Sequence, residues 1–103
     1  MIIDADKLRQ ECADFGVEVD SLAAERLDKY ADLLIEWNKR MNLTGITEPS
    51  GIVTRHFADS ASFFAAVTPR DGASIIDVGS GAGFPGMVIK ILRPDMAVTL
   101  LDA

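Results

Sequence analysis

The 103-residue sequence has a single cysteine, a single histidine, a single tryptophan and no apolar run of the ~20 residues needed to cross a bilayer. One cysteine excludes an internal disulfide and a structural zinc site, and it fits a reducing compartment. The N-terminus lacks the basic stretch and apolar stretch that mark a secretory signal. We therefore expect a cytoplasmic protein with no membrane partner and no metal site.

Positive charge is also scarce, with 10 Lys and Arg against 16 Asp and Glu, for a net charge of −6. Such a balance argues against nucleic-acid binding, because phosphates attract Lys and Arg. The deficit is uneven, however. Residues 1–36 hold 10 acids and 4 bases, whereas residues 37–70 hold 2 acids and 4 bases, with His56 besides. The mildly basic middle leaves an RNA partner open.

Apolar residues recur at steps of three and four over three stretches, which predicts three helices. The first covers residues 5–15, with Asp4 or Asp6 as its cap and Gly16 as its stop. The second begins at Asp20 or Ser21, and its predicted buried stripe is Leu27, Tyr30, Leu34, Trp37 and Met41. The third runs from about Ser50 to Val67, and its predicted buried side is Ile52, Val53, Phe57, Phe64 and Val67.

After residue 70 the apolar residues no longer follow a helical spacing. Residues 74–78 and 97–101 are short apolar runs, typical of strands buried on both faces of a parallel sheet. A glycine-rich turn (79–86) and a short helix (87–92) lie between them. Strand, glycine loop, helix and strand open a doubly wound α/β fold. We expect an α/β protein with an N-terminal helical region (1–70) and the start of an incomplete Rossmann-like domain (71–103), the front part of a longer protein.

Two glycine patterns compete in the loop. Asp77 followed by Gly79, Gly81 and Gly83 fits the acidic-x-Gly-x-Gly-x-Gly turn that binds S-adenosylmethionine, and a carboxylate there suits a cationic ligand. Residues 81–86 fit the G-x-G-x-x-G of dinucleotide binders, but two residues later than that fingerprint expects. The first pattern is the better fit. Asp102 follows the second strand, where an acid hydrogen-bonds ribose hydroxyls. A purely structural reading also stays open, in which the acids cap turns and the glycines shape a bend.

At these residues the sequence resembles the bacterial small-subunit ribosomal RNA guanine-N7 methyltransferases, formerly called glucose-inhibited division protein B. The matching stretches are 37–39, 42–44, 56–60, 76–86 and 100–102, so the likeness covers about residues 25–103. The Phe-Pro-Gly after the glycine turn is more specific than the turn itself, which many methyltransferases share.

The resemblance implies transfer of a methyl group from S-adenosylmethionine to N7 of a guanine in 16S ribosomal RNA of the small subunit. Residues implied or predicted to hold the cofactor are Asp77, Gly79, Ser80, Gly81, Gly83, Phe84 and Asp102. Family sequences continue well beyond Ala103, so these 103 residues alone are expected to be inactive.

Guanine N7 carries an available lone pair, so its methylation needs no general base, and we predict no catalytic residue. The predicted substrate contacts are Asn42, Arg55 and His56, with Lys39 and Arg40 as further nearby cations. Each has a structural alternative: His56 can be a helix histidine, and Arg55 can pair with Asp59 one turn later. An oxidoreductase fragment that binds an NAD-type dinucleotide and a non-catalytic binding module remain the alternative functions.

Overall fold

Capping aspartates begin the first two helices. The computed structural model describes residues 1–41, 45–79 and 83–101. The Asp4 carboxylate accepts hydrogen bonds from the backbone N–H groups of Asp6 and Lys7, both at 3.1 Å, at the start of α1 (Ala5–Ala13). The Asp20 carboxylate accepts from the N–H of Ala23 at 2.7 Å, and α2 spans Ser21–Met41. These contacts satisfy N–H groups that have no partner within the helix, and they confirm the predicted starts.

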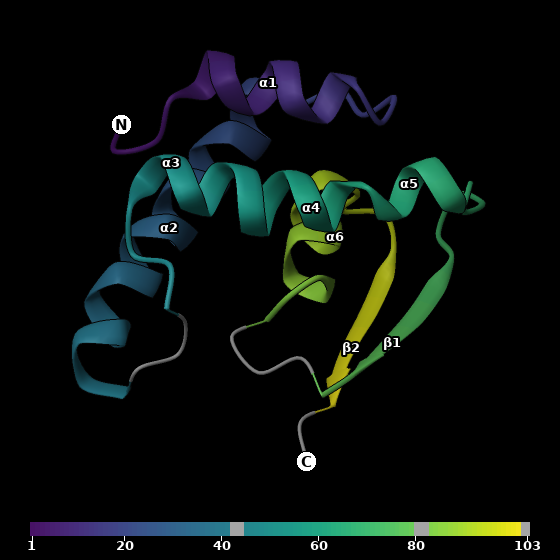
Figure 1. The fold of residues 1–103 in the computed structure, drawn as a ribbon. Coiled ribbons are helices and arrows are strands. Elements are labelled where there is room, and N and C mark those ends of the chain that lie inside the picture. Colours follow the sequence, from purple (N-terminus) through teal and green to yellow (C-terminus); the bar gives the residue numbers. More distant parts are fainter. Residues whose placement is uncertain (42–44, 80–82, 102–103) are drawn as a thin grey trace.

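The predicted third helix is a chain of short segments that crosses the front of the molecule (Figure 1). These are α3 (Pro49–Gly51), the π-helix η1 (Ile52–Ala58), α4 (Asp59–Ala61) and α5 (Phe63–Ala66). No helix in the described part of the chain is long and apolar enough to cross a membrane.

The main hydrophobic core lies where α1, α2 and η1 meet. Its largest completely buried side chains are Phe57, Leu8, Leu27 and Ile52. Val88, from the helix that follows the glycine loop, belongs to the same cluster. The core therefore draws on residues on both sides of position 70, and the division into 1–70 and 71–103 stays a prediction.

The predicted strands form a two-stranded parallel sheet with the helix α6 (Gly86–Leu92) between them in sequence. Strand β1 (Ser74–Val78) pairs with β2 (Ala97–Leu101) in a register that sets Ser74 opposite Ala97 and Val78 opposite Leu101. Because the strands are parallel, both carboxyl ends point to the lower end of the molecule in Figure 1. The chain thus combines helices with a parallel sheet, and the prediction of a mixed α/β protein is confirmed.

Three predictions of burial are wrong. Trp37 is 48% exposed, because it lies just outside the arc of α2 that faces the core. Val67 is exposed, because the last of the short helical segments, α5, ends at Ala66. The strands are not covered on both faces: Ile76 is 68% and Val78 70% exposed, since no described segment packs on that face of the sheet.

Candidate functional site

The candidate site begins where β1 ends, at the carboxyl edge of the sheet. Gly79 follows Val78 with a φ of +74°, a conformation that L side chains rarely adopt. Its N–H donates to the carbonyl of Leu101 on β2 at 2.5 Å. A Cβ added at Gly79 would meet no atom within 4 Å among the described residues other than its own chain neighbours. The main chain at Gly79 therefore adjoins open space, as close approach of a ligand to a glycine turn requires.

Asp77 links the end of β1 to the start of α6 beneath the loop. Its Oδ2 accepts a hydrogen bond from the N–H of Gly86 at 2.9 Å. A Cβ at Gly86 would lie 2.8 Å from that oxygen and 2.5 Å from a methyl carbon of Leu100. The Asp77 carboxylate therefore caps the turn, which is the structural alternative predicted for it. A direct contact of Asp77 with a cofactor stays a prediction.

Gly83 is buried, and its surroundings differ from those of Gly79. It has a φ of +98°, and a Cβ there would collide with the Tyr30 hydroxyl and lie 3.2 Å from Cβ of Met87. Tyr30 reaches the loop from α2. Glycine is thus required at position 83 by a neighbouring helix, whatever the loop binds.

Phe84 is packed against the helical region by three aromatic side chains. Its ring stacks on His56 with centroids 4.3 Å apart and planes 5° from parallel, and Tyr30 and Phe57 lie at 5.5 and 6.3 Å. Burial lowers the pKa of His56, and the nearby Asp59 opposes this shift in part. Burial also raises the pKa of Tyr30. The loop that follows β1 is therefore anchored to η1 and α2 through one ring.

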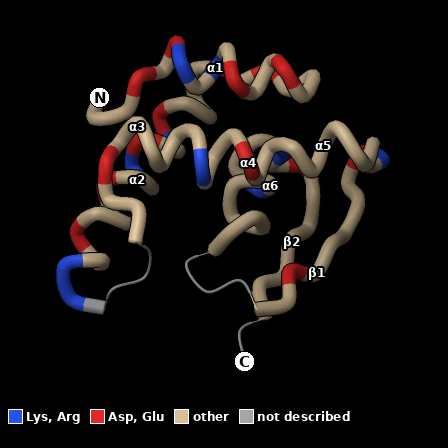
Figure 2. The backbone as a smooth tube through the Cα atoms, viewed as in Figure 1, with Lys and Arg blue, Asp and Glu red and all other residues tan. Residues whose placement is uncertain are grey.

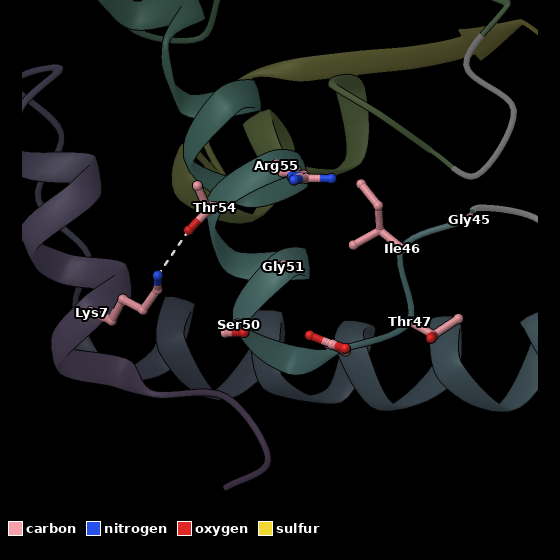
Figure 3. Close-up of a pocket in the computed structure, with 9 residues that line it drawn as sticks. Lys7, Gly45, Ile46, Thr47, Ser50, Gly51, Thr54 and Arg55 are labelled. Atoms are coloured by element: carbon pink, nitrogen blue, oxygen red, sulfur yellow. Dashed lines mark hydrogen bonds between the residues drawn. The ribbon is translucent and has the colours of Figure 1, made fainter.

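The structure separates the predicted substrate residues. His56 faces Phe84 as described, which fits its alternative as a packed helix residue. Arg55 is exposed and lines a polar cavity of about 460 Å³, where α1 meets the beginning of α3 (Figure 3). Among the described residues Arg55 forms no ion pair with Asp59, so that alternative is not supported.

Two residues that line this cavity, Lys7 and Thr54, belong to a set of hydrogen-bonded side chains. Lys7 Nζ donates to the Thr54 hydroxyl at 3.0 Å, the dashed line in Figure 3, and that hydroxyl donates to Glu11 at 2.8 Å. Lys7 also pairs with Glu11 at 3.4 Å. These contacts tie α1 to η1, and the charge of Lys7 is matched by that of Glu11.

Four predicted site residues lie outside the described residues: Asn42, Ser80, Gly81 and Asp102. The structure accordingly brings together Asp77, Gly79, Gly83 and Phe84 around the first and last turns of the loop. Sequence reasoning missed Tyr30 as a neighbour of the loop and the hydrogen bond from Gly86 to Asp77. Tyr30 belonged to a predicted core stripe, and no spacing rule connects it with a glycine 53 positions later. In the described ranges, no three His, Cys, Asp or Glu residues gather where they could hold a metal ion.

The chain matches the sequence model of a protein family over residues 23–103, and that family is described as GidB, rRNA small subunit methyltransferase G. It is also similar to curated proteins named "Ribosomal RNA small subunit methyltransferase G". Those from Clostridium perfringens, Symbiobacterium thermophilum and Chromohalobacter salexigens are 44%, 46% and 49% identical to it over 98, 96 and 90 residues.

These alignments cover 95%, 93% and 87% of this chain but 41%, 39% and 42% of the three relatives. The chain thus spans about two fifths of the length of the curated relatives it matches. The family match includes the second helix, the chain of short helical segments, the glycine loop and both strands. On this evidence the chain belongs to the GidB family.

Proposed function

We propose that the intact protein containing this chain transfers a methyl group from S-adenosylmethionine to N7 of a guanine in 16S ribosomal RNA, in the cytoplasm. The names of the relatives support action on ribosomal RNA of the small subunit. The loop after β1 supports a cofactor at the carboxyl edge of a Rossmann-like sheet, the usual ligand position in such folds.

The observation that carries the proposal is the open space beside Gly79. Gly79 has a positive φ, and no described residue beyond its chain neighbours has an atom within 4 Å of an added Cβ, which supports access of a ligand to the main chain. Asp77 lies two residues earlier and holds the turn through Gly86. The negative charge of Asp77 favours a cationic sulfonium over a pyrophosphate. The turn therefore fits S-adenosylmethionine better than a dinucleotide.

The chain's contribution to the reaction is positioning. When bound, S-adenosylmethionine would supply an electrophilic methyl carbon for the N7 lone pair, with a neutral thioether as the leaving group. Because N7 carries no proton, no side chain has to remove one. Gly79 would allow the cofactor close approach, and the packing of Phe84 on His56 would fix the end of the loop. Correct alignment of two reactants is itself a large rate effect.

The test is calorimetric titration of the intact protein with S-adenosylmethionine and with NAD. We expect binding of S-adenosylmethionine alone. Gly79→Ala should weaken it at least tenfold, because the added methyl group would occupy the open space beside the turn. Gly16→Ala is the matched control. Gly16 also has a positive φ, +75°, and no described residue beyond its chain neighbours has an atom within 4 Å of an added Cβ, but it lies in the turn that follows α1.

Binding of NAD instead would favour the dinucleotide alternative, and binding of neither compound would favour a non-catalytic module. Equal affinities of the Gly79→Ala and Gly16→Ala variants would show that the ligand does not lie at Gly79. Methylation is then measured with tritiated cofactor on small subunits that lack the modification, and the proposal expects the label at guanine N7.

A further inference from the structure

The 21-residue helix α2 has three different faces. At 100° per residue, its buried side chains Ala23, Ala24, Leu27, Ala31 and Leu34 form one face toward the core. Four acids share a second face: Glu25, Asp28, Asp32 and Glu36. The remaining arc, about 80° wide by the same geometry, contains no acid. We call it the outer face of α2, and it consists of Leu22, Arg26, Lys29, Leu33, Trp37 and Arg40.

Every residue of the outer face is exposed to solvent. Three of them, Leu22, Leu33 and Trp37, are among the large apolar side chains that the described part of the chain leaves exposed. Cationic and apolar residues are interspersed along the face over about 27 Å, at 1.5 Å per residue. A helix face that only contacts water does not need exposed leucines and a tryptophan.

The cations of the outer face are not neutralised by neighbours. Arg26 and Lys29 form no ion pair with any residue in the described ranges. Arg40 lies with its guanidinium carbon 6.0 Å from the centre of the Trp37 ring, within the range of a cation–π contact. Lys39, by contrast, is outside the outer face and pairs with Glu36 at 3.2 Å. Three positive charges therefore stay available in a chain whose net charge is −6.

The outer face leads toward the candidate cofactor site. The carboxyl end of α2 and the carboxyl ends of both strands lie at the lower end of the molecule (Figure 1). Figure 2 shows the basic residues at the end of α2 at this lower end, whereas acids are concentrated on α1 at the opposite end. The last turns of α2, to which Trp37 and Arg40 belong, therefore lie at the same end of the molecule as the end of β1, which Gly79 follows.

We propose that the outer face of α2 binds the RNA substrate, with its three cations on phosphates and Trp37 stacked on an unpaired base. This inference rests on the proposed function, which supplies RNA as the substrate. Phosphates match the unpaired cations, and the exposed face of an indole is a stacking platform for any base. The guanidinium of Arg40 lies over the Trp37 ring, so it would bind a phosphate close to the base that stacks on the indole.

The test measures binding of the intact protein, without cofactor, to two RNA probes by fluorescence anisotropy. One probe is a hairpin with an unpaired loop, and the other is a fully paired duplex of the same stem. We expect Trp37→Ala to weaken hairpin binding about 5- to 100-fold, the range for loss of one base stack, with little change for the duplex. Trp37→Phe keeps an aromatic ring and should bind the hairpin within about threefold of the parent.

The cations are tested through salt. The triple variant Arg26→Gln, Lys29→Gln, Arg40→Gln should reduce the slope of log affinity against log salt by about 2 to 3, because each phosphate contact contributes about 0.7 to 0.9. Lys39→Gln is the matched control, since it removes one cation from the same helix outside the outer face. It should change the slope by less than about 0.3.

The inference is overturned if the outer-face variants bind both probes as the Lys39→Gln variant does. It is equally overturned if they lower the thermal midpoint of unfolding while RNA affinity is unchanged, since another part of the protein would then cover the face. Cofactor affinity is measured on the same variants by calorimetry and should stay unchanged. A protein that binds S-adenosylmethionine but neither RNA probe would contradict the RNA substrate itself.

Discussion

At the scale of single residues, the two described glycines of the loop that have a positive φ, Gly79 and Gly83, differ in how much an added side chain would destabilise the protein. Both have positive φ, but only Gly83 lies against another side chain, the Tyr30 hydroxyl. We predict that Gly83→Ala lowers the free energy of unfolding by about 3 kcal/mol, from backbone strain and overpacking together. Gly79→Ala should cost about 1 kcal/mol, because it carries the backbone strain alone. Urea unfolding of both variants measures the difference.

Tyr30→Phe provides the control for that comparison. It removes the hydroxyl that an alanine at position 83 would strike, so the double variant should recover part of the loss but not the part due to backbone strain. Purely additive effects of the two substitutions would show that the hydroxyl does not restrict position 83.

His56 should make the stability of the protein depend on pH. Burial against Phe84 lowers its pKa below 6.5, although Asp59 opposes the shift. The unfolded chain then binds a proton more readily than the folded one, so the free energy of unfolding should fall as the pH drops below about 6.5. His56→Phe keeps a ring beside Phe84 but cannot titrate. Urea unfolding between pH 7.5 and 5 should show a smaller fall for this variant, and parallel curves would contradict the prediction.

The sequence predicted residues whose roles follow from local backbone chemistry, and it missed those that depend on distant neighbours. Gly79 could be recognised because a turn straight after a strand favours glycine. The contact between Tyr30 and Gly83 could not, because it depends on how α2 packs on the loop. Periodicity predicts a buried Trp37 because apolar residues recur at steps of three and four along all of α2. It does not show where the arc of the helix that faces the core ends.

At the scale of elements, the π-helix η1 explains why the third predicted helix was only partly right. A π-helix has more residues per turn than an α-helix, so side chains after η1 no longer follow the spacing that buries Ile52 and Phe57. Phe64 is accordingly half-buried and Val67 exposed. Residues 52–67 contain no proline or glycine, so this change in helical spacing could not be predicted from the sequence.

The start of α2 provides a prediction for an element that the sequence did place correctly. Asp20→Ala should lower the free energy of unfolding by about 1 kcal/mol, because it leaves the N–H of Ala23 without the carboxylate at 2.7 Å. Asp14→Ala is the control: it removes an acid from the C-terminal end of α1, where a negative charge opposes the helix dipole. Chemical denaturation should show no loss for that variant, and equal losses for both would argue against a capping role of Asp20.

At the scale of the whole molecule, the described chain has one well-covered region and one bare one. The helices bury their apolar residues around Phe57, and α6 covers one face of the sheet beside Asp77 and Leu100. The opposite face presents Ile76 and Val78 to solvent. The sequence predicted both strands and their parallel order correctly, but a strand pattern does not say whether a second layer is present. In a doubly wound fold both faces of the sheet are covered.

This bare face leads to a prediction about the 103 residues on their own. Ile76 and Val78 point to the same side of β1, and Leu101 lies opposite Val78 on β2. Because contiguous apolar surface is removed from water by association, we expect sedimentation velocity to show dimers or larger species at tens of micromolar. Replacing both β1 residues by Thr keeps the strand propensity while removing apolar area, and should weaken association at least tenfold. Leu33→Gln, on the outer face of α2, should leave association unchanged. A chain that stays monomeric at hundreds of micromolar would show that this face of the sheet is not adhesive.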